Sequence, residues 1–322
     1  MRLQCGKVLV TLPGVATFEP EPNHDMSTTF WAKSAGIPGK LTFMEGKGEL
    51  PKLQVTGPSS SAEIYLDGAQ VTNFERQGEP PLLFLSQLSR FETGAPIRGG
   101  VPIIFPWFGP REGEPMHGFA RTKTWDLREI SQLPMGGMTL KFSLPDTAEA
   151  ALLPRFKCEY AVTVGKKLSL ELIITNASDD QDLTFENCLH TYFAVGDINS
   201  VSITGLKGCG YLDKAENFAR KTEMAEHIKI TQETDRIYLD TAHTVEIHDS
   251  KLGRRIIVEK TGSLSTVLWN PWTGKAQQMP DFGNEEYLQM VCVESGNVSD
   301  NRLTLPAGKT HSLKVEISSV PL

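Results

Sequence analysis

The sequence predicts an all-β fold, a large antiparallel β-sandwich with few short helices. Apolar and polar side chains alternate with a period of two in residues 160–164 and again in residues 168–174, which is typical of strands with one packed face. Between two short apolar runs, Asp67-Gly68 indicates a tight hairpin turn. A βαβ rhythm is absent, which argues against a parallel doubly wound sheet.

Strand signals continue through most of the chain after residue 50. Residues 1–50 show no apolar period, so we expect an N-terminal extension that is poorly ordered. Residues 51–322 are expected to form one β-sandwich domain. Further strands are expected at residues 183–195, 201–204, 244–248, 255–259, 266–269, 287–294 and 312–317, and short helices at residues 85–91 and 146–153.

The bulk composition sets limits on partners and location. With 322 residues, of which 39% are hydrophobic, the chain can bury a substantial core. Its net charge of −7 argues against a nucleic-acid partner, because phosphate binding needs clustered Lys and Arg. No apolar run is long enough for a membrane helix, and the five cysteines lack a C-x-x-C spacing, which favours a reducing compartment. We therefore expect a cytoplasmic monomer without a membrane or nucleic-acid partner, and targeting to an organelle by the extension stays open.

A segment rich in glycine and proline, residues 98–109, is the first candidate binding element. Gly99 and Gly100 relieve steric limits and allow a ligand or a second strand to approach the backbone. Arg98 can bind an anion through two hydrogen bonds, and the flat ring of Trp107 can lie against a sugar ring. The alternative is a packed loop in which Arg98 binds backbone carbonyls, and the spacing alone does not decide between the two.

Residues 117–121 form a second candidate element that begins with His117 and ends with Arg121. A lone histidine in a loop is more often structural or solvated than catalytic. Arg121 changes this interpretation, because together with Arg98 and Lys123 it can form an anion-binding corner. For Lys123 itself, an exposed strand charge is the favoured interpretation.

His190 and Glu294 lie in segments that are too apolar for ordinary surface loops. Strand alternation places His190 on the same face as Tyr192, and Glu294 ends the apolar run of residues 290–293. An imidazole or a carboxylate in such a place costs free energy unless it is paired or used. Together with His117, these residues predict one acid–base site assembled from distant strands. The alternative for His190 is a core histidine bonded to backbone.

Other classes of site lack their sequence signatures. Two histidines and a carboxylate can form a metal triad, but no H-x-H, H-x-D or H-E-x-x-H spacing is present, so a metal site is the weaker hypothesis. Neither a G-x-S-x-G elbow nor a G-x-G-x-x-G or P-loop motif occurs. We therefore expect neither a metal nor a cofactor.

Seven motifs together resemble a known family. In chain order they are Arg98-Gly99-Gly100-Val101-Pro102, Pro106-Trp107-Phe108-Gly109, His117-Gly118-Phe119-Ala120-Arg121, His190-Thr191-Tyr192-Phe193, Asp235-Arg236-Ile237-Tyr238, Trp269-Asn270-Pro271-Trp272 and Val293-Glu294-Ser295-Gly296-Asn297. The pattern spans about residues 53–317. It resembles the glucose-6-phosphate 1-epimerase (hexose-6-phosphate mutarotase) branch of the aldose 1-epimerase superfamily.

The resemblance implies a galactose-mutarotase-like β-supersandwich. It also implies an isomerase that interconverts the α and β anomers of hexose 6-phosphates, glucose 6-phosphate first, by acid–base opening and reclosure of the ring. In this scheme His190 is the general acid and Glu294 is the general base. The residues that the resemblance implies for substrate binding are Arg98, His117, Arg121 and Asp235, and we add Trp107 for the stacking reason given above.

Several alternatives stay open at this point. An epimerase of free aldoses and a noncatalytic carbohydrate-binding protein on the same fold both fit the motifs, and the preferred hexose is not fixed. Met116 stands where some relatives carry a Gln that touches substrate, so that contact differs here. We expect the imidazole of His190 and the carboxyl of Glu294 on opposite sides of one pyranose-sized hollow, with guanidinium groups at its rim.

Overall fold

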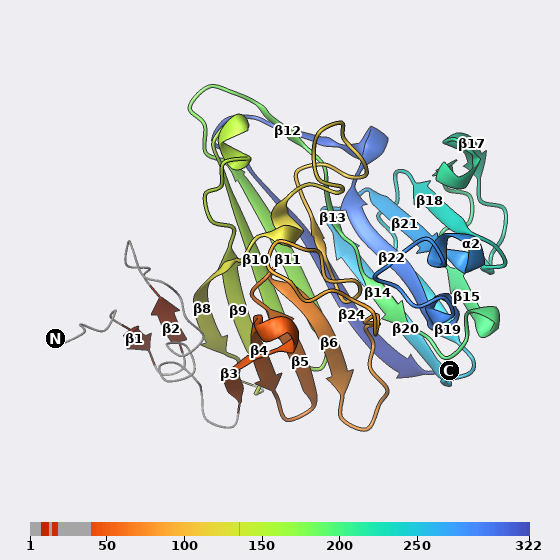
Figure 1. Ribbon diagram of the computed structural model, residues 1–322, viewed down its shortest axis with the longest axis horizontal. Helices are drawn as coiled ribbons and strands as arrows, with labels where there is room; N and C mark the ends of the chain where they lie inside the picture. Colours follow the sequence, from red (N-terminus) through yellow and green to blue (C-terminus); the bar gives the residue numbers. More distant parts are fainter. Residues whose placement is uncertain (1–7, 13–14, 19–39, 135) are drawn as a thin grey trace.

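The computed structural model describes residues 8–12, 15–18, 40–134 and 136–322, which form mainly antiparallel strands (Figure 1). The all-β prediction is confirmed. The largest sheet has ten strands in the order β1 (Val8–Leu12), β2 (Val15–Phe18), β8 (Asp126–Gln132), β9 (Met138–Ser143), β10 (Phe156–Val164), β11 (Leu168–Asn176), β24 (Thr310–Pro321), β20 (Arg254–Thr261), β19 (Val245–Asp249) and β15 (Val201–Thr204).

A second sheet of eight strands contains the candidate acid–base residues. Its order is β17 (Ala219–Thr222), β16 (Gly210–Asp213), β18 (Thr234–Tyr238), β21 (Ser265–Asn270), β22 (Met290–Asn297), β13 (Asn187–Leu189) and β7 (Ile103–Ile104), and β14 (Tyr192–Ala194) pairs with β22 beside β13. Strands from distant parts of the sequence are therefore neighbours in this sheet.

Two smaller sheets and a few short helices complete the fold. The four-stranded sheet is β3 (Leu41–Glu45), β4 (Pro51–Thr56), β5 (Ser60–Tyr65) and β6 (Gln70–Arg76), and β12 (Leu183–Phe185) pairs with β23 (Leu303–Leu305). The α-helix α2 spans Trp272–Ala276, and the 3₁₀ turns are η1 (Lys47–Glu49), η2 (Ala120–Thr122), η3 (Ala150–Leu152), η4 (Ile198–Ser200), η5 (Lys214–Glu216), η6 (Glu286–Gln289) and η7 (Ser299–Asn301).

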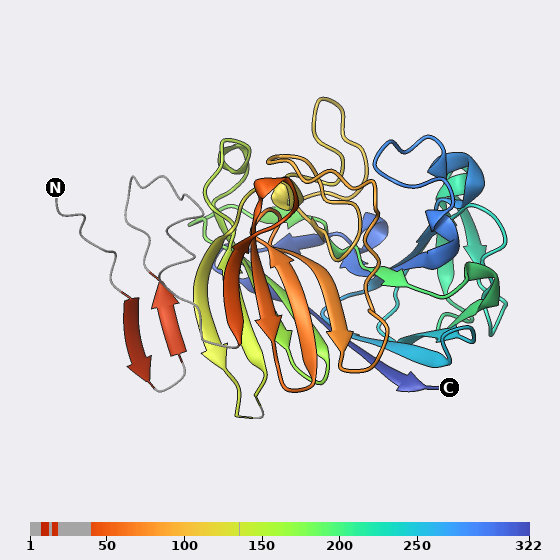
Figure 2. The ribbon, with the colours of Figure 1, turned by 60° about the horizontal axis from the view of Figure 1, so that its bottom comes forward.

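One large apolar core joins all four sheets. It contains Leu53 of the four-stranded sheet, Leu172 of the ten-stranded sheet and Val293 of the eight-stranded sheet, all essentially inaccessible to solvent. Figure 2 shows the four-stranded sheet lying across the strands of the ten-stranded sheet. Because side chains alternate along a strand, the residues of β22 on either side of Val293 point away from this core. That second face of the eight-stranded sheet carries Cys292 and Glu294.

The strands predicted at residues 160–164 and 168–174 are confirmed and form a hairpin, and the hairpin predicted around Asp67-Gly68 is present with a longer turn. β10 pairs with β11 in an unbroken register from Phe156↔Asn176 to Val164↔Leu168, and burial alternates along both strands. β5 pairs with β6 around Asp67-Gly68, although the connection is the four residues between Tyr65 and Gln70 rather than a two-residue turn. The positive φ angles in this connection fall on Gly68 (72°) and Ala69 (45°).

One expectation of local structure is wrong, and two are confirmed only in part. Residues 85–91 form turns and irregular backbone instead of a helix, because the segment bonds to residues 98–99: the Ser86 N–H donates to the Arg98 carbonyl. Residues 146–153 contain the 3₁₀ turn η3 and no α-helix. The strand expected at residues 183–195 is divided into β12, β13 and β14. The sequence pattern also misses α2, because five residues are too short to show a helical period.

Strands that precede residue 50 take part in two sheets. β2 pairs with β8, and β3 pairs with β4. Leu41 and Phe43 of β3 are buried in the core. The division into an extension of residues 1–50 and a domain of residues 51–322 stays a prediction, since most of the extension lies outside the described residues.

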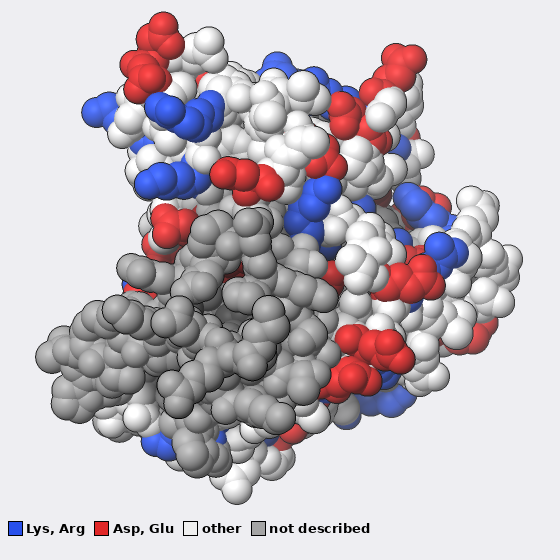
Figure 3. All heavy atoms as spheres, turned by 60° about the vertical axis from the view of Figure 1, so that its left-hand side comes forward, with Lys and Arg blue, Asp and Glu red and all other residues white. Residues whose placement is uncertain are grey.

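The surface drawn in Figure 3 carries Lys and Arg interspersed with Asp and Glu. A basic patch of the kind that binds a phosphate backbone is therefore not present on the coloured part of this face. Within the described residues, no helix is both long and apolar enough to cross a membrane.

Candidate active site

The register of the eight-stranded sheet brings His190 next to Glu294. Leu189 of β13 pairs with Ser295 of β22, and Tyr192 of β14 pairs with Cys292. The register is the same on both sides of the gap, so His190 lies directly across from Glu294. Residues opposite each other in an antiparallel pair project to the same face of a sheet.

The strand is interrupted at His190 by hydrogen bonds to a third segment. The His190 N–H donates to the Pro102 carbonyl (3.0 Å), and the Tyr192 N–H donates to the Gly100 carbonyl (2.9 Å). The Thr191 N–H closes a three-residue turn onto Leu189 (2.9 Å). The backbone of Gly100 approaches the neighbouring strand so closely that a Cβ would lie 2.2 Å from the Val71 carbonyl oxygen, which explains the glycine there.

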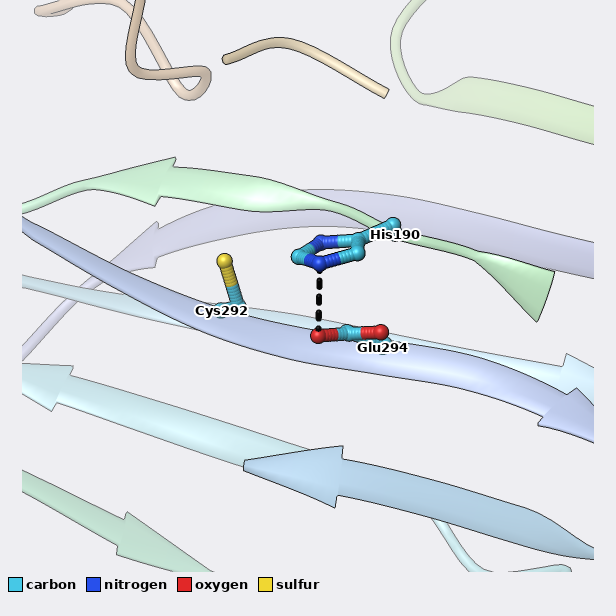
Figure 4. A group of neighbouring side chains, drawn as sticks. All are labelled: His190, Cys292 and Glu294. Carbon is cyan, nitrogen blue, oxygen red and sulfur yellow. Dashed lines mark ion pairs between the residues drawn. The ribbon is translucent and has the colours of Figure 1, made fainter. Parts of the chain in front are cut away.

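His190 and Glu294 are in direct contact (Figure 4). Nε2 of His190 lies 3.2 Å from Oε1 of Glu294, and the side chains are 9% and 1% exposed. The expectation that the two groups stand on opposite sides of a hollow is therefore wrong, because the shared register makes them cross-strand neighbours.

Burial controls the charge of this pair. It raises the pKa of Glu294 well above its ordinary value, and the nearby Asp235 carboxylate acts in the same direction. Burial also lowers the pKa of His190 well below its ordinary value, and His117, Arg121 and Arg98 add to this effect. Both shifts disfavour the charged forms, so burial favours a neutral carboxyl group beside a neutral imidazole.

Aromatic rings fix the orientation of the His190 side chain. The ring of Tyr192 stacks on it with centroids 4.8 Å apart and planes 11° apart, which confirms that these residues share a face. Trp269 meets the imidazole edge-on at 6.0 Å. Nδ1 of His190 is buried without a hydrogen-bond partner in the described part of the chain. The alternative of a core histidine bonded to backbone through its ring is thus not what the structure shows.

His117 lies beside His190 as a neutral hydrogen-bond donor. The two rings are 5.7 Å apart and nearly perpendicular. Nδ1 of His117 accepts the Gly109 N–H (3.0 Å), so the ring proton is on Nε2. Burial, followed by the charges of Arg121, Lys214 and Arg98, lowers the pKa of His117 to about 2.

Arg98 is held by a carboxylate and a phenol. Its guanidinium donates to both oxygens of Asp281 at 3.0–3.3 Å and to the Tyr192 hydroxyl at 3.1 Å. The Gln70 amide donates to the carbonyls on either side of Arg98, those of Ile97 (3.0 Å) and Gly99 (2.6 Å). The packed-loop alternative, with the guanidinium on backbone carbonyls, is therefore wrong.

Arg121 differs from Arg98 in its partners. Its Nη2 donates to the Met116 carbonyl (2.7 Å), whereas its Nε is buried without a partner among the described residues. No carboxylate within the described ranges forms an ion pair with it. Burial lowers the pKa of Arg121 to about 10, so it stays cationic at neutral pH. Lys123 instead pairs with Glu149 (2.6 Å) and does not join this group.

Asp235 and Trp107 complete the predicted set. Asp235 lies in the same row of the sheet as Trp269 and Cys292, and its Oδ2 pairs with Nζ of Lys214 (2.9 Å). The Trp107 indole donates to the Pro115 carbonyl (3.0 Å), and the Arg111 guanidinium lies over its ring at 5.1 Å. One face of this ring is thus covered by protein.

The sequence interpretation did not identify two charged residues at the site. Asp281 binds Arg98, and Lys214 binds Asp235 and lies over the Phe108 ring at 5.3 Å. Both belong to irregular or 3₁₀ segments without an apolar period, so only the long-range fold reveals them. The seven motifs do not include either residue.

One potential metal-ligand atom from each of His190, Cys292 and Glu294 lies within 4.8 Å of the other two, which is close enough to hold a metal ion. His117 is not part of this group, so the triad of two histidines and a carboxylate is not formed. Nε2 of His190 already contacts Oε1 of Glu294 at 3.2 Å. That no metal is required stays an expectation.

Comparison with known proteins identifies the family. The model of the family described as Aldose 1-epimerase matches residues 51–318. A protein from Cenchrus ciliaris named "Putative glucose-6-phosphate 1-epimerase" is 35% identical over 269 residues, which cover 81% of this chain and 82% of the relative. A protein of the same name from Escherichia coli (strain K12) is 34% identical over 281 residues, which cover 83% and 91%.

Solved structures agree with this assignment. The crystal structure of a "putative mutarotase" from Salmonella typhimurium superposes with a TM-score of 0.82 and 30% sequence identity, covering 89% of this chain and 96% of that chain. The predicted galactose-mutarotase-like fold is thereby confirmed. The chain belongs to the aldose 1-epimerase family and is an enzyme that interconverts sugar anomers.

Proposed function

We propose that this enzyme acts on hexose 6-phosphates, with glucose 6-phosphate as the first candidate, and that His190 and Glu294 transfer the protons. The observation that carries the proposal is the buried contact of 3.2 Å between Nε2 of His190 and Oε1 of Glu294. The relatives named as glucose-6-phosphate 1-epimerases support the phosphorylated substrate. Arg98, Arg121 and Asp235 remain the proposed substrate-binding residues, with His117 donating from Nε2.

One proton is shared between the two residues. Burial favours the neutral pair, whereas the reaction needs a carboxylate as base and an imidazolium as acid. Both states contain the same number of protons and have the same total charge. A proton transfer across the 3.2 Å contact therefore prepares the pair without bringing a net charge into the site.

The ring opens and closes by reciprocal proton transfer. The Glu294 carboxylate takes the proton of the anomeric hydroxyl, and the His190 imidazolium gives its proton to the ring oxygen as the bond between that oxygen and the anomeric carbon breaks. The aldehyde then rotates about the C1–C2 bond and recloses on its other face, while the two protons return. Each positioned acid or base typically contributes about 10²–10⁴-fold to such a rate.

Cationic side chains around the pair give the proposed phosphate a place to bind. Arg121 is cationic and makes no carboxylate ion pair within the described residues, whereas Arg98 is compensated by Asp281. Arg98 and Arg121 also disfavour the charged form of His190. A bound phosphate offsets these charges, so substrate binding itself favours the imidazolium that the reaction needs.

Anomer exchange measured by magnetisation-transfer NMR tests the proposal. Wild type and Glu294→Gln are compared on glucose 6-phosphate, galactose 6-phosphate and mannose 6-phosphate and on the plain sugars. We expect fast exchange of a phosphorylated sugar by wild type and a loss of about 10²–10⁴-fold in the variant. Faster exchange of plain sugars than of their phosphates would support an epimerase of free aldoses. Fast exchange that is unchanged in Glu294→Gln would show that Glu294 is not the general base.

A cytoplasmic monomer is part of the same proposal. The charges on the face in Figure 3 are mixed, and the described residues contain no membrane-spanning helix. Light scattering of the purified protein measures its mass against the 35.5 kDa of one chain. A mass twice that value would contradict the monomer.

A further inference from the structure

Glu294 has a second partner besides His190. Sγ of Cys188 lies 3.6 Å from Oε2 of Glu294, while Nε2 of His190 lies 3.2 Å from Oε1. Both Cys188 and Glu294 are almost fully buried. Each oxygen of the carboxyl group is therefore in contact with one neighbouring side chain, and neither neighbour is a permanent cation.

Gly296 creates the space that Cys188 occupies. Cys188 and Gly296 are directly opposite each other in the β13–β22 pair. A Cβ at residue 296 would lie 2.8 Å from Cβ and 2.9 Å from Sγ of Cys188, and 2.5 Å from the Asn187 carbonyl oxygen. A side chain at 296 would thus displace the thiol from Glu294. Gly296, two residues after Glu294, is therefore explained by packing, because it leaves room for the Cys188 thiol.

The thiol is the donor when Glu294 is ionised. Burial and the neighbouring Glu294 raise the pKa of Cys188 well above its ordinary value, so the sulfur keeps its proton. A carboxylate accepts hydrogen bonds at both oxygens, and a donor to the charged form favours that form. A thiol is a weak donor, so it stabilises the carboxylate without locking it in the ionised state.

We propose that Cys188 is a positioning residue for Glu294: its S–H donates to Oε2, sets the rotation of the carboxyl group, and leaves Oε1 directed at His190 for proton transfer. This inference rests on the proposed role of Glu294 as the general base. It goes beyond that role by assigning the second carboxylate oxygen to a thiol that Gly296 admits.

The other groups that act on Glu294 come from several neighbouring elements. They are Asp235 of β18, Lys214 of η5, Arg121 of η2, Tyr192 of β14, Cys292 of β22 and His190. Substitution of Cys188 leaves all of them in place. A shift in the pH profile that follows the donor strength of residue 188 therefore reports on the thiol contact.

Three variants separate positioning from packing. Cys188→Ala removes the donor, Cys188→Ser restores a donor with a stronger O–H group, and Cys158→Ala removes an equally buried thiol from β10 in the ten-stranded sheet. The acidic midpoint of kcat/KM for anomer exchange reports the apparent pKa of the coupled His190–Glu294 pair in the free enzyme, to which the carboxylate of Glu294 contributes. We expect this midpoint to rise by about half to one pH unit in Cys188→Ala, to return to the wild-type value or below in Cys188→Ser, and to stay unchanged in Cys158→Ala.

An infrared measurement tests the contact without any turnover. The S–H stretching band of Cys188, identified by its loss in Cys188→Ala, should lie at lower frequency than that of a thiol without a hydrogen bond. If Cys188→Ala and Cys188→Ser both keep the wild-type midpoint, or if the band is that of a free thiol, the inference is wrong although anomer exchange proceeds. If wild type shows no exchange, the proposed function fails, and the band still decides whether the contact exists.

Discussion

The β10–β11 hairpin and the segment that pairs with β22 are both antiparallel, but only the hairpin is a continuous ladder. In the hairpin, pairing runs without a break from Phe156↔Asn176 to Val164↔Leu168. Opposite β22, pairing stops after Leu189 and resumes in the same register at Tyr192. The interruption is one histidine and one threonine long.

The difference shows that the continuous hairpin contributes to stability, whereas the interrupted segment positions side chains of the candidate site. Buried positions of the hairpin carry apolar residues such as Leu170 and Leu172. At the interruption, the N–H groups of His190 and Tyr192 instead bond to the segment that follows Arg98. Regular pairing is absent over two residues. In its place, backbone hydrogen bonds connect three distant segments around the buried side chains of His190 and Glu294.

The largest expected effect concerns the interrupted region. His190→Gln should lower kcat for anomer exchange by about 10²–10⁴-fold, because it removes the proposed general acid. Circular dichroism and thermal melting check that the fold is retained. His248→Gln, at a partly exposed histidine of β19 in the other sheet, is the matched control and should keep the wild-type rate. Equal losses in both variants would contradict a specific role of His190.

A substitution in the continuous β10–β11 hairpin should lower stability and leave the rate of anomer exchange unchanged. Leu172→Ala should lower the free energy of unfolding by about 2–5 kcal/mol, because it leaves a cavity at a fully buried position. At temperatures where the variant stays folded, kcat/KM should equal that of wild type. Urea unfolding and NMR exchange measure the two quantities. A large loss of kcat at full folding would show that the two regions are coupled.

Arg121 is expected to affect substrate binding more than the stability of the fold. Arg121→Met should raise KM for glucose 6-phosphate by about 10–100-fold, since a charge-assisted hydrogen bond is worth about 1.5–3 kcal/mol. KM for plain glucose should stay nearly constant. Lys123→Met, which removes a cation two residues away that pairs with Glu149, is the control. The same increase of KM for both sugars would contradict phosphate binding by Arg121.

Lys260 links the two sheets and is expected to give the smallest effect. From β20 its amine donates to the carbonyl of Ser265 and the hydroxyl of Thr266 on β21 (2.8 Å each) and to the hydroxyl of Thr241 (3.1 Å). Burial lowers the pKa of Lys260 from 10.5 to about 7. Between these values the unfolded chain binds more protons than the folded one, so the contribution of Lys260 to stability rises with pH and is lost as pH falls toward 7.

Chemical unfolding at two pH values tests this sign. From pH 7 to pH 8, the free energy of unfolding of wild type should rise by about 1 kcal/mol relative to that of Lys260→Met. Lys167→Met, at an exposed lysine of the ten-stranded sheet's β10–β11 connection, is the control and should parallel wild type. A wild-type protein that loses stability relative to Lys260→Met over this interval would contradict the prediction.

The parts of the fold that the sequence predicts are those set by local pattern. Period-two alternation predicts the strands β10 and β11, and Asp67-Gly68 predicts a β5–β6 connection, although not its four-residue length. The break at His190 is not predictable in this way, because its cause is a backbone segment about ninety residues earlier in the chain. The helix expected at residues 85–91 fails for the same reason, since residues 98–99 bind its backbone.

The candidate site shows the same limit. The apolar surroundings of His190 and Glu294 indicate that these groups are paired or used, and the motifs suggest that they belong to one site. Their direct contact depends on the register between two strands about a hundred residues apart. Asp281 and Lys214 carry no local signal at all, and only the folded chain shows that they neutralise Arg98 and Asp235.

The unchanged register across the gap at His190 has an evolutionary consequence. An insertion or deletion of one residue inside either strand would turn the imidazole or the carboxyl to the opposite side of the sheet and separate the two groups. Loops at the sheet margins can change length without moving either group. Selection can therefore alter which sugar is accepted through the loops while the proposed proton-transfer pair is inherited intact.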